Sequence, residues 1–591
     1  MNCMMNKYKH ILLLTAVLAV CASACKKNLE EEPLEQLSPD YVWDTQDSAG
    51  VNASKVLNEI YTEIPAGANR IFSASSSENG SDFLDAATDD AVSSSPFVTP
   101  VELIATGIGI TPFRNAEGGS FGTDIWAANY RGIRKANIFM ANIDKVPLAG
   151  TLPNGTRLRS AWKAEARFLR ALFYFELVKR WGGVPIVGDE VKQITDDVLL
   201  PRNSYAECVQ YIVSECDAVK DSLRLDPIDN INFGRVTRGT AMALKARMLL
   251  YAASTLYNGG NIGTSGPERL VAGYENEDRN RWKLAADAAA DIVQLGVFSL
   301  QADMVNTFIV ANNKEVIFAR NNGRGTDIEK ANGPIGFAGE ATGGSRTSPT
   351  QELVEAFPMK NGKPITDPTS GYNPTSPYTN RDPRLDSTIL YAGARWLNTF
   401  IETYEGGRHK PGGSKTQTKT SYYLRKFMGH FRNQSTYAPH PRNFVMFRYA
   451  EVLLNYAEAQ NEFNGPDNNV YDALYALRKR AGISAGAANN YGIPQNLTKE
   501  QMREIIRNER RVELAFEEHR YWDIRRWKIA GELAKKPLHG LRIKRSEVSG
   551  SIDGTKVIVL QPRFLEPKMY LYPIAQNELD KNKNLIQNPG W

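Results

Sequence analysis

The sequence predicts a mainly α-helical protein, built as a scaffold of helix pairs with long irregular loop insertions. Residues 162–181 contain neither glycine nor proline, and their apolar residues crowd more than one helical face, which indicates a helix buried on most sides. Several later segments come in pairs in which alanines recur at helical spacing opposite large apolar residues, a pattern that permits close helix packing. Residues 306–444 are rich in Gly, Pro, Ser, Thr and Asn and keep no sustained helical pattern.

Ten segments have the periodicity of helices. They are residues 52–64, 126–143, 162–181, 203–224, 236–258, 281–295, 445–463, 470–482, 499–518 and 521–530. The segment 162–181 ends at Gly182-Gly183, with Pro185 beyond, and the segment 203–224 follows as its expected partner. The later segments form three more pairs, which resemble tetratricopeptide repeats with irregular insertions. Residues 65–123 are predicted to be mostly loop.

Length and charge exclude some classes of protein. A chain of 591 residues with 42% hydrophobic and 23% charged residues can bury a large core, in one large domain or two interlocked ones. Lysine and arginine exceed aspartate and glutamate by five, and residues 1–24 carry Lys7 and Lys9 and no acid, so the remainder has a formal charge of +3. We therefore expect no nucleic-acid partner.

The N-terminus predicts an export signal. Two lysines precede an apolar run over residues 11–20, which is too short to span a membrane because a spanning helix needs roughly 20 apolar residues. Residues 1–24 are therefore interpreted as a signal peptide. Small residues lead to Cys25 as in the lipobox of bacterial lipoproteins, so we expect Cys25 to be the first mature residue and to carry palmitate or related acyl chains as a membrane anchor. The alternative is an ordinary secretory signal cut near Ala24.

The remaining cysteines predict neither a disulfide nor a metal site. Cys208 and Cys216 are eight residues apart in a predicted helix, which separates them by about 12 Å. A disulfide needs Cα atoms within about 7 Å, so we expect two buried free thiols. The six histidines have no zinc-type spacing, and we expect no structural metal and no cofactor.

Charged residues are dense in the C-terminal helices. Seven arginines in residues 503–526 could suggest nucleic-acid binding, but acids interleave with them at i, i+3 and i, i+4 spacing, which favours a structural helix laced with ion pairs. Glu451, Glu458 and Glu462 could form an acid and base pair. We favour the interpretation that they are buried or bridge to arginines such as Arg448 and Arg478.

Several segments together resemble one family. They are FLRALFYFELVKRWGGVP (168–185), GRVTRGTAMALKARMLLY (234–251), RYAEVLLNYAEAQNE (448–462), LRKRAGI (477–483), IIRNERRVELAFEEHRYWDIRRW (505–527) and LYPIAQNELDKNKNLIQNPGW (571–591). They resemble the SusD/RagB family of Bacteroidetes surface lipoproteins over nearly the whole mature chain. The resemblance implies a SusD-like fold, with residues 25–240 as an N-terminal region, residues 241–591 as a C-terminal region, and both in one interlocked unit whose variable loops span about 306–444.

The same resemblance implies a function in binding and no enzymatic activity. Family members sit on the outer-membrane surface and act as a lid over a SusC-type TonB-dependent transporter. They deliver an oligosaccharide to it, or a peptide in the RagB branch, and the sequence does not separate these two ligands. A glycosidase, the third hypothesis, would need two carboxylates roughly 5 to 9.5 Å apart across a cleft, and we expect no such pair.

Four residues are candidate ligand contacts. Asp82 occupies a Ser-Asp position that the resemblance places near the ligand face, and Phe83 follows it. Trp396 and Tyr404 lie in the 306–444 loops, where flat rings could stack on sugar faces. The alternative is that such aromatics pack onto their own scaffold. A further group, Asp82, Asp85, Asp89 and Asp90, could hold Ca²⁺, although we favour solvated loop acids.

Overall fold

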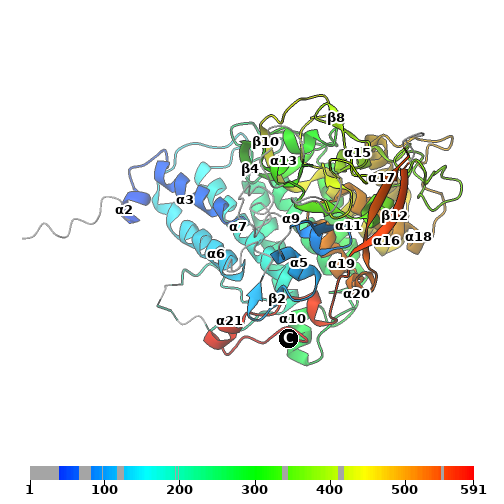
Figure 1. Cartoon of the computed structure of the whole chain (residues 1–591). Helices are drawn as coiled ribbons and strands as arrows, with labels where there is room; N and C mark the ends of the chain where they lie inside the picture. Colours follow the sequence, from blue (N-terminus) through cyan, green and yellow to red (C-terminus); the bar gives the residue numbers. More distant parts are fainter. Residues whose placement is uncertain are drawn as a thin grey trace, which may run out of the picture.

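The computed structural model describes residues 39–64, 82–95, 98–115, 125–192, 195–196, 199–335, 344–409, 418–546 and 552–591. The predicted signal peptide and Cys25 lie outside these residues. The protein is mainly helical, as predicted (Figure 1). None of the helices in the described ranges combines the length and the apolar character needed to cross a membrane.

The organising helix of the N-terminal half is α7, which spans Leu158–Trp181 and buries 18 of its 24 residues. It packs between α6 and α8. At its end, Gly182 has φ of 75°, and a Cβ there would lie 2.2 Å from the carbonyl oxygen of Val271, so only glycine fits. The long helices of this half are α3 (Val51–Thr62), α6 (Ile125–Asn142), α8 (Tyr205–Val219) and α9 (Arg238–Ala253).

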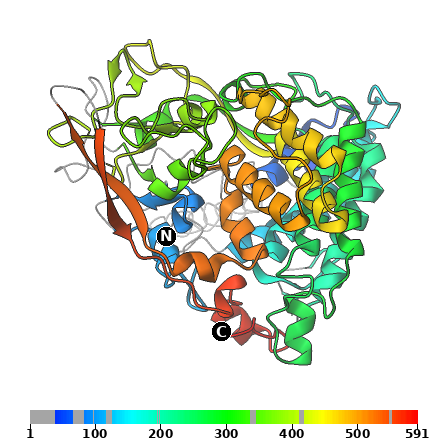
Figure 2. The same cartoon turned by 90° about the vertical axis from the view of Figure 1, so that its right-hand side faces the viewer.

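The helix pairs continue through the C-terminal half. α9 packs against α11 (Asn280–Gln294), α11 packs against α16 (Tyr449–Asn464), and α16 packs in turn against α17 (Asn468–Ala481) and α18 (Lys499–Glu513). Figure 2 shows these green, yellow and orange helices lying next to one another. α19 (His519–Arg526) follows α18 after a break. Three of the four predicted helix pairs are therefore present side by side, namely α7 with α8, α9 with α11, and α16 with α17, while α18 and α19 do not pack along each other as a pair.

Several helix bounds differ from the prediction: α8, α9 and α19 end four or five residues earlier than predicted, and two further differences concern α16 and α18. Residues 445–448 belong to strand β10 (His440–Arg448), which pairs antiparallel with β4 (Val316–Gly325), and the helix begins only at Tyr449. The apolar Val-Met-Phe sequence suits a half-buried strand as well as a helix, so local pattern does not distinguish them. α18 ends at Glu513, because Phe516 and Glu518 have φ of 64° and 62° and interrupt the helical path.

The remaining elements are short, apart from the β11–β12 hairpin at one edge of Figure 2. The strands are β1 (Ala91–Ser93), β2 (Ile110–Thr111), β3 (Arg114–Asn115), β5 (Thr347–Pro349), β6 (Ile389–Leu390), β7 (Arg395–Trp396), β8 (Thr399–Phe400), β9 (Tyr423–Leu424), β11 (Leu538–Arg545) and β12 (Ile552–Leu560). The short helices are α2 (Pro39–Val42), α5 (Pro100–Ala105), α10 (Gly266–Ala272), α12 (Asn306–Ile309), α13 (Asp327–Asn332), α14 (Gln351–Ala356), α15 (Pro383–Thr388), α20 (Ala530–Ala534) and α21 (Gln576–Lys581).

Two hydrophobic clusters dominate the interior. The larger one surrounds α7 and includes residues from α3 through α9, together with Trp522 and Tyr572 from the C-terminal part. The second joins Phe83 to the loops of residues 304–431 and to Phe516 and Ile543. The segment 82–93 therefore packs inside the C-terminal loops. Cys208 and Cys216 are buried free thiols, as predicted.

Candidate functional site

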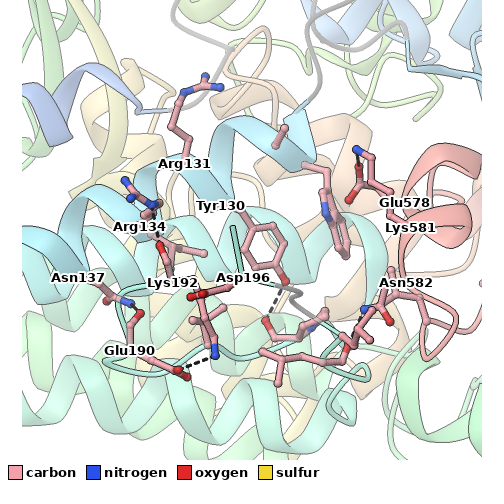
Figure 3. Close-up of a pocket in the computed structure, with 18 residues that line it drawn as sticks. Tyr130, Arg131, Arg134, Asn137, Glu190, Lys192, Asp196, Glu578, Lys581 and Asn582 are labelled. Atoms are coloured by element: carbon pink, nitrogen blue, oxygen red, sulfur yellow. Dashed lines mark hydrogen bonds and ion pairs between the residues drawn. The ribbon is translucent and has the colours of Figure 1, made fainter. Parts of the chain in front are cut away.

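A cavity of about 690 Å³ opens between α6, the segment 185–200 and α21. Its volume lies in the range of small-ligand pockets, roughly 300 to 1,000 Å³. Figure 3 shows the side chains that line it, with α6 on one side and the C-terminal residues around α21 on another. Segments more than 380 residues apart in sequence therefore meet at this cavity.

Two aromatic residues of α6 form one wall. The ring of Trp126 lies 5.1 Å from that of Tyr130 and meets Trp181 of α7 edge to face at 5.2 Å. The Tyr130 hydroxyl donates to the carbonyl oxygen of Pro185 at 2.8 Å (Figure 3), and burial raises the pKa of Tyr130 well above its ordinary value. The hydroxyl is thus a fixed donor, and the rings are held in place by the core behind them.

The opposite wall is held by a buried polar network. Nδ2 of Asn137 donates to the carbonyl oxygens of Gly188 and Glu190, each at 2.9 Å. Behind it, the buried Arg170 donates to Oδ1 of Asn137 at 2.8 Å and to Asp189 at 2.6 Å, and this ion pair lowers the pKa of Asp189. The segment that closes the cavity is therefore fixed to both α6 and α7.

The rim of the cavity carries charges that are mostly paired. The pairs are Arg131 with Glu63 at 3.1 Å, Lys192 with Glu190 at 2.5 Å, and Lys581 with Glu578 at 3.1 Å. Arg134 donates instead to the carbonyl oxygen of Lys192. An aromatic wall with a polar rim suits the binding of a molecule that has both apolar faces and hydroxyl or amide groups.

The predicted ligand residues lie elsewhere, around the second hydrophobic cluster. Phe83 is 0% exposed and stacks on Phe427 with ring centroids 5.5 Å apart. Trp396 is also 0% exposed, and its Nε1 donates to the Tyr437 hydroxyl at 3.1 Å. Neither ring has an open face for a sugar in this structure, which is the arrangement expected of aromatics that pack on their own scaffold.

Asp82 and Tyr404 differ in exposure. Asp82 is buried, and burial raises its pKa above the ordinary value. Tyr404 is half-buried, and its hydroxyl accepts from Nη1 of Arg545 at 3.2 Å while that guanidinium lies 5.2 Å from the ring centre. Of the four predicted ligand residues, Tyr404 is therefore the one whose side chain is partly exposed. Ligand binding by these four residues stays a prediction.

The aspartates beyond Asp82 are not solvated, so that interpretation is wrong. Asp89 accepts two hydrogen bonds from Arg520, both at 2.8 Å, and the Asp90 carboxylate pairs with Arg511 at 2.6 Å. Asp85 accepts from the backbone N–H of Phe516 at 3.0 Å. These carboxylates join the segment 82–93 to α18 and α19. In the described part of the chain, no three or more His, Cys, Asp or Glu side chains are grouped so as to hold a metal ion.

Comparisons with known proteins agree with this fold over most of the chain. A model described as "SusD family" matches residues 314–591, and a model described as "Starch-binding associating with outer membrane" matches residues 38–250. The chain belongs to the SusD/RagB family. A relative, SusD-like protein P2 of Formosa agariphila, is 25% identical over 483 residues, which cover 79% of this chain and 80% of that protein.

Solved structures share the SusD-like fold. A SusD-like protein from Bacteroides fragilis is 25% identical with a TM-score of 0.74, covering 95% of this chain and 100% of that one. A SusD-like carbohydrate-binding protein from the same species is 24% identical with a TM-score of 0.69, over 92% and 100% of the two chains. A protein described as a laminarin-binding SusD-like protein is 20% identical with a TM-score of 0.61, over 92% and 100%.

The helix carboxylates of this SusD/RagB chain serve as ion-pair partners, as predicted, although the arginines differ. Glu451 pairs with Arg247, Glu458 with Arg526, and Glu462 with Arg503. The arginines named from the sequence have other partners: Arg448 pairs with Glu315, Glu513 and Glu517, and Arg478 pairs with Glu509. The pairs join separate helices more often than successive turns of one helix.

The α6 cavity was missed by sequence reasoning. The sequence does place Trp126, Tyr130 and Asn137 on one face of a helix, and that face lines the cavity. An aromatic helix face of this kind usually packs in the hydrophobic core, and part of this face does so, since Trp126 packs on Trp181. The segments that close the cavity, residues 185–200 and α21, carry no periodic signal that would place them against α6.

Proposed function

We propose that this protein is a lipid-anchored outer-membrane protein that binds an oligosaccharide and delivers it to a SusC-type TonB-dependent transporter. The observation that carries the proposal is the match to SusD-type family models in both the N-terminal and the C-terminal part of the chain. One of these models is described as starch-binding and associating with the outer membrane. Neighbours of the same fold are described as binding carbohydrate or laminarin. Carbohydrate is therefore the ligand class that these similarities favour.

The loop region around Tyr404 is the proposed sugar surface. Backbone pairing fixes this segment to β11, since the Glu405 N–H donates to the carbonyl oxygen of Ile543 at 2.8 Å. In the same segment Phe400 is 57% exposed, and Arg395 lies opposite it in the β7–β8 hairpin. Exposed rings on a rigid backbone, beside arginine donors, provide the stacking and hydrogen bonding that a pyranose needs.

We further propose that the protein has no enzymatic activity. Glu451, Glu458 and Glu462, the carboxylates that could have formed an acid and base pair, are all engaged by arginines. Glu458 is a poor general acid at neutral pH, because Arg526 lowers its pKa to about 2. Release of reducing ends from a polysaccharide by the purified protein would contradict this part of the proposal.

The decisive experiment is a binding screen with protein that begins at residue 26. Isothermal titration with laminarin oligosaccharides, maltoheptaose and a mixed peptide library is repeated for Tyr404→Ala and Phe400→Ala. We expect saturable binding of at least one glycan and a loss of about tenfold in affinity in each variant, since one stacking ring contributes on the order of 1.4 kcal/mol. Phe113→Ala is the matched control, because Phe113 is 84% exposed on another segment.

Results of the binding screen that differ from this expectation would assign the ligand or the site differently. Peptide binding without glycan binding would assign the protein to the RagB-like alternative. Glycan binding that Tyr404→Ala leaves intact but Leu199→Glu abolishes would place the ligand in the α6 cavity, where Leu199 is an exposed lining residue. Binding of neither ligand class would refute the proposal.

The anchor and the partner are tested in cells. Cys25→Ala should release the protein from the outer-membrane fraction, because acyl chains contribute about 0.8 kcal/mol per buried methylene and are lost with the cysteine. The wild-type protein, extracted in mild detergent, should co-purify with a TonB-dependent transporter. Retention of Cys25→Ala in the membrane fraction would contradict lipidation at this residue.

A further inference from the structure

A second cavity, of about 550 Å³, lies in the C-terminal helices. α16 packs against both α11 and α18, so it lies between them, and the three helices enclose the cavity. Glu458 and Glu462 line it from α16, Trp282 from α11, and Arg503 and Arg507 from α18. The turn at Gly259-Gly260, after α9, and Trp527 also line it, together with the charged residues Glu277, Arg279, Lys499 and Glu504.

The two glutamates of α16 are already neutralised. Glu462 accepts two hydrogen bonds from Arg503, at 2.5 and 2.6 Å. Glu458 pairs with Arg526 and also accepts from Nε1 of Trp527 at 2.7 Å. Each carboxylate therefore has a fork of donors of its own, and neither presents an unpaired negative charge to the cavity.

Arg507 differs from Arg503, the other arginine that α18 contributes to this cavity, which pairs with Glu462. Its side chain is 21% exposed, and within the part of the chain that the structure describes it has one carboxylate partner, Glu504, at 3.3 Å. Glu504 is itself 73% exposed, so this pair is weak. The guanidinium lies 4.9 Å from the ring centre of Trp527, and burial lowers the pKa of Arg507 below its ordinary value.

Arg279, a second and exposed cation of the lining, has polar but uncharged partners. Arg279 donates through Nε to the carbonyl oxygen of Phe463 and through Nη2 to the side chain of Asn464 at 3.4 Å. Arg507 is the half-buried one of the two, and because its one carboxylate partner is weak, its charge is incompletely compensated against desolvation. An anion that enters the cavity would supply the missing negative charge.

The other lining groups suit a sugar ring. Trp282 is half-buried and packs against the small cluster of Leu250, Ala253, Ala285, Ala286 and Ala459, while it also lines the cavity. Thr255, at the end beyond α9, is exposed and offers a hydroxyl. An indole face beside hydroxyl and guanidinium donors is a combination that binds the flat apolar face and the polar edge of a pyranose at once.

We propose that this cavity binds an acidic sugar residue, with its carboxylate or sulfate on Arg507 and its ring on Trp282. Arginine is suited to this role because its planar fork of donors matches a carboxylate or sulfate edge, which a neutral sugar lacks. The site is separate from the surface around Tyr404, so the inference does not depend on the function proposed above.

The test uses methyl glucuronide, glucose 6-sulfate and methyl glucoside as probes, titrated into the protein that begins at residue 26. We expect the acidic probes to bind at least tenfold more tightly than methyl glucoside, and the tighter of the two identifies carboxylate or sulfate as the preferred group. Arg507→Gln should remove at least tenfold in affinity for that probe. Glu504→Gln should tighten its binding severalfold, because the competing carboxylate is gone and the exposed side chain is not needed for folding.

Controls separate a site from a general charge effect. Arg159→Gln removes a partly exposed arginine of α7 that lines neither this cavity nor the surfaces described above, and it should leave the affinity for the acidic probes unchanged. Trp282→Ala should weaken binding of the ring, and Trp282→Phe should restore it. Equal affinity for acidic and neutral probes, or unchanged affinity in Arg507→Gln or Glu504→Gln, would overturn the proposal. Competition by inorganic sulfate as strong as that by the acidic sugars would reduce the site to an anion site and also overturn it.

Discussion

Replacing Glu458 by glutamine removes one charge from the buried ion pairs that connect the C-terminal helices. The Glu458 side chain is 5% exposed, and its two oxygens pair with Arg526 at 2.5 and 2.7 Å, while Nε1 of Trp527 donates to one of them. Glutamine has the same shape and keeps one acceptor oxygen. The substitution therefore tests the charge with little change in packing, and it leaves Asp523 as the remaining carboxylate on Arg526.

The magnitude follows from the ionisation of Glu458. The charge of Arg526, with hydrogen bonds from Arg526 and Trp527, outweighs burial and lowers the pKa of Glu458 from 4.5 to about 2. At about 1.36 kcal/mol per tenfold change, this stabilises the folded protein by about 3 kcal/mol at pH 7. Because the folded pKa is the lower one, the stabilisation is complete above pH 4.5 and is lost as the pH falls through 2, with about half left near pH 3.

The assay is urea unfolding of wild type and Glu458→Gln at pH 7 and pH 3, followed by tryptophan fluorescence. We expect the difference in apparent unfolding free energy to fall from about 3 kcal/mol at pH 7 to about 1.5 kcal/mol at pH 3. Glu532→Gln is the control, since Glu532 and its partner Lys535 are both largely exposed, and its midpoint should match wild type. An equal difference at both pH values would refute the reasoning, because it would assign the effect to shape instead of charge.

Three further predictions concern packing and burial. A Cβ at Gly132 would lie 2.6 Å from the ring of Phe173, so Gly132→Ala should cost about 1 to 3 kcal/mol in chemical unfolding, while Gly266→Ala, with open space around its Cβ, should not destabilise the protein. Trp396→Ala empties a fully buried site and should cost about 3 to 5 kcal/mol, seen as a lower melting temperature; an unchanged melting temperature would argue against the buried position. Burial raises the pKa of Asp226 from 3.8 to about 6, so ionisation of this carboxyl destabilises the folded protein as the pH rises through that range. Asp226→Asn should therefore raise the urea midpoint above that of wild type, and the increase should be larger at pH 7 than at pH 4.

The helices were predictable because their signals are local. The run 162–181 has no helix breaker and stops at two glycines, and α7 ends at Trp181 as that signal implies. The strand at residues 445–448 was not predictable in the same way, since its partner β4 begins at Val316 and contributes nothing to the local pattern. Where a segment's structure depends on a distant partner, its own periodicity can favour the wrong element.

Loop aromatics show a second limit of the sequence. Trp396 and Tyr404 are eight residues apart in the same loop region, yet the indole is fully buried and the phenol is half-exposed. In a helix or strand the period tells which side chains face inward, but an irregular segment has no period. The indole of Trp396 points inward because it packs against Phe431 and Tyr437, which are distant in sequence.

The candidate anion site rests on a distinction that the sequence cannot make. Arg507 and Arg510 are one helical turn apart on α18, both in a run of alternating charges. Arg510 is fully buried and pairs with Asp523 of α19 at 2.7 Å, so its charge serves the fold. Arg507 faces the gap between α18 and α11, where the protein supplies only a weak partner. What separates a structural arginine from a ligand-binding one is therefore which neighbouring helix it faces, and that is decided by the packing of helices more than 200 residues apart.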